Sequence, residues 1–357
     1  MEYLNINSLA KEFKTPPEIR NILFEKYDQM VPKDIVITTN ELELIRGEEL
    51  IEDAIKNKIK IVPLKRASYI KDTDGFPKRI LLELTNKCNS YCSVCPRNAS
   101  NRDEIHMETE LAKNLISQFA EVGISGLWLY CIGESLLHPD FFDILKYCRQ
   151  YDNLGPIWLS TNGELMDANL RKTILENPVD ILNYSVNSMS EEGYKEISPN
   201  LNFHKIHENL TELIKLKKDQ NKTKPIIRAQ MIEIPHVLNE IEYFKKEYGN
   251  KADILSFNKL EIFSQNLESE ELEKEKVFNK KIKKCNRLDR VDFFILSNGV
   301  VTCCDTDFNG DLNLGNVNEH SIKEIFEGDK YQDLLKQYKE GRLNERPLCA
   351  KCKDFDL

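Results

Sequence analysis

The sequence lacks long apolar runs, a secretion signal and an excess of positive charge, and each absence excludes a class of protein. No stretch of about 18 consecutive apolar residues is present, which argues against a membrane-spanning helix. The opening MEYLNINSLAKEF has neither a basic segment nor an apolar core, so it does not resemble a signal peptide. The net charge of −9 provides no general basic surface, which argues against nucleic-acid and membrane partners.

Cysteine is the informative residue type, because ten cysteines occur in 357 residues. Disulfide frameworks belong to secreted chains, whereas an acidic chain without a secretion signal is expected to keep its thiols reduced. We therefore expect a cytoplasmic, oxygen-sensitive protein that uses cysteines to bind metal. Hydrophobic residues at 41% and charged residues at 31% describe an ordinary globular protein, long enough for about two or three domains.

Three of these cysteines form a compact motif. Cys88, Cys92 and Cys95 lie in the run TNKCNSYCSVCPR, directly after the apolar stretch 79–85. Three thiolates in one short loop can bind three irons of a cubane iron–sulfur cluster and leave the fourth iron open, as a catalytic site requires. The alternatives are a zinc knuckle and three unrelated thiols. Zinc sites favour paired C-x2-C arms with a fourth ligand close by, and no clear fourth ligand is near in the sequence.

The C-x3-C-x2-C spacing resembles the signature of the radical S-adenosylmethionine (SAM) enzymes. The resemblance implies a SAM-binding 4Fe–4S cluster whose open iron takes the amino and carboxylate groups of SAM. One electron then cleaves SAM to a 5′-deoxyadenosyl radical, which abstracts a hydrogen atom from the substrate. The resemblance also implies a partial (β/α)6 TIM-like barrel and a reductant such as flavodoxin or ferredoxin.

From Arg79 onward, apolar runs alternate with amphipathic stretches, which is the pattern of βα units on a parallel sheet. The pattern predicts an α/β fold, but it does not by itself distinguish a partial barrel from an open sheet. In both folds the reactive groups lie at the carboxyl ends of the strands. Strands are expected at 79–85, 126–131, 156–161, 180–186, 226–234 and 253–259, and helices near 109–122, 139–151, 167–176, 203–219 and 237–248.

Composition divides the chain into four segments. Residues 1–76 are expected to form an accessory α+β domain with a weak resemblance to ParB/sulfiredoxin-like proteins. Glu48 and Glu49 replace the His-Arg pair of that group, which favours a substrate- or partner-binding role over nucleotide handling. Residues 77–263 are predicted to be the radical SAM core, 264–284 a Glu- and Lys-rich linker, and 285–357 a cysteine-bearing domain.

The same resemblance implies several SAM-binding residues. Gly133 and Glu134 follow the second core strand and match a Gly-Gly-Glu-like motif that receives the SAM ammonium group, although Ile132 replaces its first glycine. Ser185, at the end of the fourth strand, matches a position that reaches the SAM ribose or carboxylate. Arg228 either clamps the SAM carboxylate with its guanidinium or is an ordinary interstrand charge.

The C-terminal segment carries a second cysteine pattern. Cys285 and Cys304 flank Gly299 as C-x13-G-x4-C, and Cys349 and Cys352 follow as C-x2-C. The pattern resembles Twitch, the short version of the SPASM extension, and implies one auxiliary 4Fe–4S cluster with four ligands. A cluster whose irons all have protein ligands is better suited to carrying electrons than to binding a substrate. The alternative is that the C-x2-C pair is half of a zinc site.

Three further assignments concern single residues. The glycine spacing favours Cys304 over the adjacent Cys303 as the auxiliary ligand. Asp305 follows that ligand directly, and in related sulfatase-maturating enzymes an aspartate at this place is the base that deprotonates the substrate. Asp307 is its competitor, and either aspartate can instead be a hairpin turn residue. Cys131 ends the second core strand, where it is either a small buried hydrophobe or a hydrogen-atom donor.

These patterns support three hypotheses about function. The first is a radical SAM oxidoreductase that dehydrogenates a small molecule in a two-electron oxidation, with the auxiliary cluster as electron acceptor; the ligand spacing most resembles a Twitch-bearing aminocyclitol dehydrogenase. The second is radical maturation of a ribosomal peptide or protein by epimerisation or crosslinking. That reading requires a leader-binding module, which residues 1–76 do not resemble. The third is a non-enzymatic iron–sulfur protein.

Overall fold

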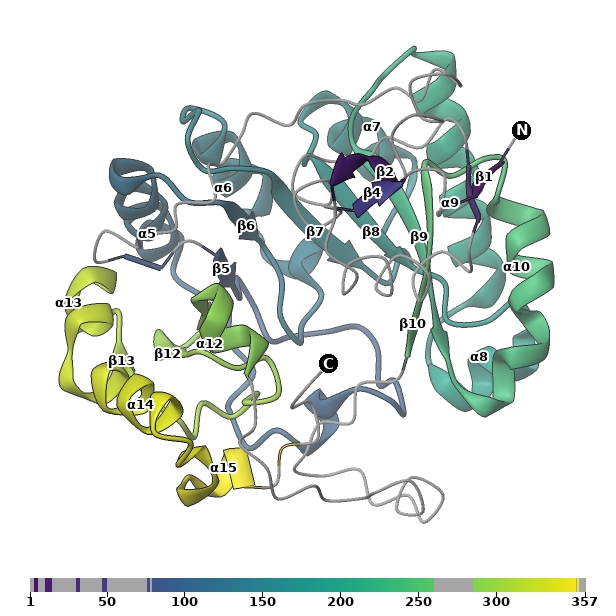
Figure 1. Ribbon diagram of the computed structural model, residues 1–357. Helices are drawn as coiled ribbons and strands as arrows, with labels where there is room; N and C mark the ends of the chain where they lie inside the picture. Colours follow the sequence, from purple (N-terminus) through teal and green to yellow (C-terminus); the bar gives the residue numbers. More distant parts are fainter. Residues whose placement is uncertain are drawn as a thin grey trace. The chain divides into compact units, whose positions relative to one another are not determined.

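The computed structural model describes residues 76–77, 79–259, 285–350 and 352, together with four short strands nearer the N-terminus (Figure 1). The linker expected at 264–284 and most of the accessory domain expected at 1–76 lie outside the described residues. The four N-terminal strands form two antiparallel pairs. They are β1 (Tyr3–Asn5) with β3 (Met30–Pro32), and β2 (Ala10–Lys14) with β4 (Gly47–Glu49).

The chain separates into two compact units, which are described one at a time. The first unit includes residues 89–93 and 155–260, and four parallel strands form its sheet in the order β7-β8-β9-β10. Most of their described side chains are buried, as expected for a parallel sheet covered on both faces. The strands are β7 (Ile157–Thr161), β8 (Ile181–Ser185), β9 (Ile226–Glu233) and β10 (Ile254–Lys259).

Side-chain caps start three of the helices in this unit. Asp167, Ser190 and Asn202 each accept a hydrogen bond from a backbone N–H in the first turn of the helix that follows. Such caps satisfy donors that a helix start otherwise leaves without a partner. The helices are α7 (Ala168–Glu176), α8 (Glu191–Ile197), α9 (Phe203–Asp219), the 3-10 helix η3 (Pro235–Glu240) and α10 (Ile241–Tyr248).

The second unit includes residues 69–88, 94–154 and 261–357, and its sheet joins distant parts of the sequence. Strand β5 (Arg79–Leu82) pairs in parallel with β6 (Gly126–Trp128) on one side and with β11 (Asp292–Ile295) on the other. β11 continues antiparallel into β12 (Val300–Thr302), which pairs with β13 (Gly315–Asn316). The C-terminal hairpin therefore extends the sheet that contains the first core strand.

Helices complete the second unit, and α5 and α6 lie side by side (Figure 1). Ser117 of α5 and Tyr147 of α6 join through their hydroxyl groups at 2.7 Å. The helices are α5 (Thr109–Val122), α6 (Phe141–Cys148), α12 (Asn286–Arg290), α13 (Ile322–Glu327), α14 (Asp329–Lys339) and α15 (Pro347–Ala350), with 3-10 turns η1 (Pro96–Ala99), η2 (Ser135–Leu137) and η4 (Leu343–Glu345).

The α/β alternation expected from the sequence is confirmed. All six expected strands are present as β5 to β10, and the five expected helices are α5, α6, α7, α9 and α10. Strand β5 ends at Leu82 instead of 85, because Thr85 turns to bond with segment 103–107 through an isolated bridge to His106. Helix α8 was not expected; its seven residues are too few for a strong periodic pattern.

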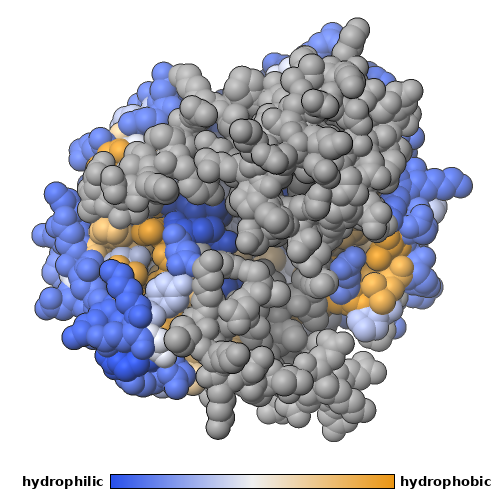
Figure 2. Space-filling model, viewed as in Figure 1, coloured by the Kyte–Doolittle hydropathy of each residue, from blue (hydrophilic) through white to orange (hydrophobic). Residues whose placement is uncertain are grey.

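Most described side chains on the face shown in Figure 2 are hydrophilic, with apolar groups confined to smaller areas. Over the described ranges, every helix is too short or too polar to cross a bilayer.

Candidate active site

The cysteine triplet lies in the loop that follows β5. Its three thiols are partly accessible and none forms a disulfide. The start of this loop is anchored by Asn86, which uses both ends of its amide. Its Nδ2 donates to the carbonyl of Asp103 at 2.8 Å, and its Oδ1 accepts from the backbone N–H of Ile105 at 2.7 Å. Because Asn86 is only 2% exposed, this anchor fixes the backbone just before Cys88.

The middle of the loop, residues 89–93, is held by a network of polar side chains in the first unit. Asn89 donates to Glu164 Oε2 at 2.9 Å and accepts from Asn162 Nδ2 at 2.8 Å. The backbone N–H of Tyr91 donates to Asn200 Oδ1 at 2.9 Å. Asn162 and Gly163 directly follow β7 and begin a turn. The structure shows that Asn162 and Glu164, at this turn, position the cysteine loop.

The donor set fits a cubane cluster better than a single metal ion. In a cubane each thiolate binds its own iron, so the ligands need not converge on one point. A structural zinc site instead requires four ligands around one ion. Cys88, Cys92 and Cys95 provide three thiols, which would hold three irons of a cubane cluster.

Gly133 and Glu134 pack against the start of the cysteine loop, and their binding of the SAM ammonium group stays a prediction. The backbone N–H of Glu134 donates to the carbonyl oxygen of Lys87 at 2.9 Å. A Cβ atom on Gly133 would lie 2.2 Å from the Thr85 carbonyl oxygen and 2.9 Å from that of Lys87. Only glycine permits this approach. Glu134 is 2% exposed, and its Oε1 accepts from the Leu136 N–H at 3.4 Å.

Gly133→Ala is expected to displace the loop that begins at Thr85, because the added methyl overlaps backbone atoms that have no flexible side chain to move. We expect SAM affinity to fall by at least about tenfold, equal to about 1.4 kcal/mol. Equilibrium binding of SAM to the reconstituted protein measures this. Gly123→Ala is the matched control, since its nearest contact would be 3.7 Å and it carries only the strain of φ +71°. Equal losses in both variants would contradict the steric argument.

Ser185 and Arg228 lie on neighbouring strands of the first unit. Ser185 is the last residue of β8 and is opposite Gln230 of β9, while Arg228 is opposite Asn183. The guanidinium of Arg228 is 7% exposed, and its Nη2 donates to Ser256 Oγ of β10 at 2.8 Å. The position of Ser185 at a carboxyl end agrees with a ligand-facing role. Arg228 thus makes an interstrand contact. Its role as a clamp for the SAM carboxylate stays a prediction.

Several C-terminal cysteines influence one another's pKa values. Burial raises the pKa of the Cys349 thiol to about 12, with further contributions from the neighbouring thiols of Cys352 and Cys285. Burial also raises the pKa of Cys303 strongly, and the thiols of Cys285 and Cys349 again contribute. Thiols that influence one another in this way lie within short electrostatic range. These cysteines would hold the auxiliary cluster.

The adjacent thiols Cys303 and Cys304 have different surroundings. Cys303 is 3% exposed and lies in electrostatic range of Cys285 and Cys349. Cys304 Sγ lies 3.1 Å from the hydroxyl of Thr306. The glycine spacing favours Cys304 as the fourth ligand, whereas the surroundings of Cys303 favour Cys303. Both thiols stay candidates.

The two aspartates proposed as the base differ in what they contact. Asp307 is 1% exposed and accepts from Thr302 Oγ1 at 2.6 Å and from the N–H groups of Asp311 and Leu312 at 2.8 and 3.0 Å. Burial raises its pKa, although these hydrogen bonds oppose the rise. Asp307 thus closes the turn after β12. The Asp305 side chain is 30% exposed and forms an ion pair with Arg287, so it is the more exposed of the two aspartates.

The Cys131 thiol lies in electrostatic range of Cys95 in the cysteine loop and of Asp305 beside the auxiliary cysteines. Its pKa is raised well above the usual value, first by burial and then by the negative charge of Glu83. Asp305 and Cys95 contribute in the same direction. The thiol is therefore protonated at neutral pH, as a packing residue or a hydrogen-atom donor must be. Its role in catalysis stays a prediction.

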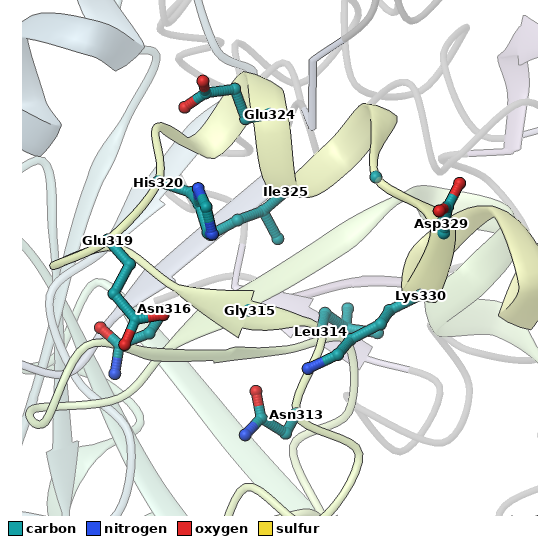
Figure 3. A pocket seen from close by; sticks show the side chains of 11 residues that line it. Asn313, Leu314, Gly315, Asn316, Glu319, His320, Glu324, Ile325, Asp329 and Lys330 are labelled. Atoms are coloured by element: carbon teal, nitrogen blue, oxygen red, sulfur yellow. The ribbon is translucent and has the colours of Figure 1, made fainter.

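A separate cavity of about 520 Å³ lies beside β13, α13 and α14 (Figure 3). Its lining is largely polar and includes three carboxylates, one of which, Glu324, is already bonded to Ser321 at the start of α13. None of the predicted site residues lines this cavity. The lining residues that Figure 3 labels are Asn313, Leu314, Gly315, Asn316, Glu319, His320, Glu324, Ile325, Asp329 and Lys330.

Two family models match separate parts of the chain. The radical SAM superfamily model matches residues 82–227, and the SPASM iron–sulfur cluster-binding domain model matches residues 285–353. The first match contains the cysteine triplet and the Gly133–Glu134 motif, and the second contains all the cysteines of the auxiliary group.

Curated relatives and solved structures resemble the chain at low identity. GTP 3′,8-cyclase from Limosilactobacillus fermentum is 28% identical over 195 residues, which cover 47% of this chain but only 58% of the relative. The S-adenosyl-L-methionine-dependent 2-deoxy-scyllo-inosamine dehydrogenase of Niallia circulans is 21% identical over 280 residues, covering 78% of this chain and 93% of the relative. A solved structure of anSMEcpe with bound AdoMet is 17% identical, covers 78% of this chain and 85% of that chain, and has a TM-score of 0.57.

The structural likeness confirms the expected α/β partial-barrel fold, and the two family models confirm the expected cofactors, which are SAM, a 4Fe–4S cluster and auxiliary iron–sulfur binding. The chain belongs to the radical SAM enzymes that carry a C-terminal auxiliary cluster domain of the SPASM type.

Proposed function

We propose that the protein is a radical SAM oxidoreductase that dehydrogenates a small molecule at a carbon bearing a hydroxyl or amino group. The observation that carries this proposal is the position of Asp305, which adjoins the auxiliary cysteines and pairs with Arg287. Both Asp305 and Cys95 lie in electrostatic range of the Cys131 thiol. An oxidation needs a hydrogen-abstracting centre, a base and an electron acceptor near one substrate. The similarity to a SAM-dependent dehydrogenase over 78% of the chain supports the same class of reaction.

The protein's own residues divide the work as follows. Cys88, Cys92 and Cys95 would hold the first cluster, which would supply electrons for the cleavage of SAM, and the C-terminal cysteines would hold an auxiliary cluster that could accept an electron from the substrate. Gly133 and Glu134 orient SAM through its ammonium group, and Ser185 contacts its ribose or carboxylate. Asp305 takes the proton from the substrate hydroxyl or amino group. Arg287 forms an ion pair with the Asp305 carboxylate and orients it.

A second candidate function is radical maturation of a ribosomal peptide or protein, by epimerisation or crosslinking. The observation that favours epimerisation is the protonated thiol of Cys131, since quenching a carbon radical requires an S–H bond. The small-molecule reading is preferred because dehydrogenation uses both the auxiliary cysteines and Asp305. A low-potential reductant, of the flavodoxin or ferredoxin kind, serves either reaction.

The two functions are separated by isotope transfer. The reconstituted protein is incubated anaerobically with SAM, dithionite and candidate alcohols, amines or peptides, in normal and in deuterated water. For a dehydrogenase, we expect deuterium from the labelled substrate carbon in 5′-deoxyadenosine and about one oxidised product per SAM cleaved. Solvent deuterium at an inverted carbon identifies epimerisation instead. A full panel that releases no 5′-deoxyadenosine above the substrate-free background argues against both.

Asp305→Asn is expected to separate SAM cleavage from product formation. Asparagine keeps the shape but cannot accept the proton, so oxidised product should fall by about 10²- to 10⁴-fold, the usual contribution of a general base. Formation of 5′-deoxyadenosine should remain, since that step precedes deprotonation. Liquid chromatography of both products measures the ratio. Asp307→Asn is the comparison, because Asp307 bonds within the turn and should change stability more than this ratio.

A further inference from the structure

The sulfur of one cluster cysteine is contacted by two buried hydroxyl groups. Ser198 Oγ donates to Cys92 Sγ at 3.0 Å, and Ser90 Oγ lies 2.9 Å from the same sulfur. The two serines are 0% and 3% exposed, so water does not compete for these contacts. Ser90 lies within the cysteine loop, and Ser198 directly follows α8.

The direction of the Ser198 hydrogen bond is fixed by a third residue. Asn187 Nδ2 donates to Ser198 Oγ at 3.0 Å, and an amide nitrogen can only donate. The Ser198 oxygen therefore accepts from Asn187, and its O–H is directed at the sulfur of Cys92. Ser90 must also donate once Cys92 binds iron, because a metal-bound thiolate accepts hydrogen bonds and has no proton to give.

Backbone contacts hold this arrangement in place. Ser198 ends α8, where its N–H bonds to the carbonyl of Tyr194 at 2.8 Å, so its hydroxyl is not needed to close the helix. The N–H of Ser93, next to Cys92, donates to the carbonyl of Ile197 at 2.7 Å. The C-terminal end of α8 is thus fastened to the cysteine loop. Helix α8, absent from the predicted elements, delivers the hydroxyl of Ser198 to the cluster ligand.

We propose that Ser198, oriented by Asn187, and Ser90 are positioning residues that raise the reduction potential of the SAM-binding cluster. Reduction adds negative charge to the cluster and its thiolates, and a hydrogen bond to sulfur stabilises the more negative form. The two hydroxyls make the first electron easier to accept from a low-potential one-electron donor. The inference rests on the cluster being bound at Cys92 and is independent of which substrate the proposed reaction uses.

The test is a redox titration of the reconstituted full-length protein with dithionite, followed by low-temperature electron paramagnetic resonance. The signal that changes on addition of SAM reports the SAM-binding cluster. For Ser198→Ala we expect the ratio of reduced to oxidised cluster at a fixed potential to fall by about three- to tenfold, a shift of about 30 to 60 mV for one electron. Ser90→Ala should shift the same way, and Ser198→Thr, which keeps the hydroxyl, should restore the potential.

Ser93→Ala is the matched control. Its hydroxyl lies in the same loop but contacts the Ile197 carbonyl oxygen at 3.4 Å, so its loss should leave the potential unchanged. Normal iron content with unchanged potentials in both Ser198→Ala and Ser90→Ala would overturn the proposal, as would an equal shift in Ser93→Ala. If Ser198→Ala fails to fold, the reduction potential of Ser90→Ala alone tests the proposal. If the variants shift the reduction potential but the protein oxidises none of the candidate substrates, this inference is supported and only the proposed function is contradicted.

Discussion

Replacing Cys88 or Cys95 with alanine is expected to abolish SAM cleavage while the auxiliary cysteines keep their iron. A cubane held by two thiolates has lost one of only three protein ligands, and the open iron that binds SAM is lost with the cluster. Formation of 5′-deoxyadenosine should drop to the uncatalysed background, at least about a millionfold on the usual scale of enzymatic acceleration. Liquid chromatography measures the nucleoside, and iron should fall to about half of the wild-type content.

Two further variants make this result specific. Cys148→Ala removes a buried thiol of α6 whose pKa burial raises to about 12, and it should retain activity and iron because Cys148 only packs. Cys349→Ala should show the converse defect, with loss of auxiliary iron and retention of the SAM-responsive paramagnetic signal. Full SAM cleavage by Cys88→Ala would refute the assignment of the triplet.

The elements and cysteine groups were predictable because their signals are local. Strands β5 to β10 are short apolar runs such as Ile181–Ser185, and the helices between them have apolar residues at helical spacing. The triplet lies within one loop, so its spacing alone indicated the chemistry. Gly133 was predictable from a motif, and the structure adds the reason, which is a Thr85 carbonyl too close for any Cβ atom.

The residues that support the site were not predictable in the same way. Asn162, Glu164 and Asn200 are far from the cysteine loop in sequence, and polar residues after strands are common in all α/β proteins. Ser198 reaches the loop only because α8 ends there. Such contacts depend on how distant segments pack, which periodicity and spacing do not report. The pairing of β11 with β5, more than two hundred residues earlier, is of the same kind.

A buried ion pair in the second unit is expected to be a major determinant of stability. Glu83 is 0% exposed and accepts two hydrogen bonds from Arg102, at 2.7 and 2.9 Å, and one from the N–H of Ser297 at 2.9 Å. Arg102 Nε also donates to the carbonyl of Phe308 at 2.7 Å. Burial lowers the pKa of Arg102, but its bonds and charge contact with Glu83 outweigh burial and raise it overall. The pair therefore ties the end of β5 to the C-terminal hairpin.

Arg102→Met is expected to lower the free energy of unfolding by about 3 to 5 kcal/mol, because it leaves the Glu83 carboxylate buried without its partner. Glu83→Gln should cost a similar amount for the converse reason. Glu83→Gln with Arg102→Met together should be less destabilised than the sum of the two, since neither charge then remains buried. Urea unfolding of the reconstituted proteins, followed by the iron-dependent absorbance and by circular dichroism, measures all three.

Arg342→Met is the control, because Arg342 pairs with Glu340 and Glu345 on the exposed surface, where such pairs contribute little. Its unfolding curve should match that of the wild type. Since the hairpin carries Cys303, Cys304 and Asp305, the buried-pair variants should also release auxiliary iron before the SAM-binding cluster is lost. Single variants as stable as Arg342→Met would mean that the pair is not a determinant of stability. Strictly additive losses in the double variant would mean that Glu83 and Arg102 act independently.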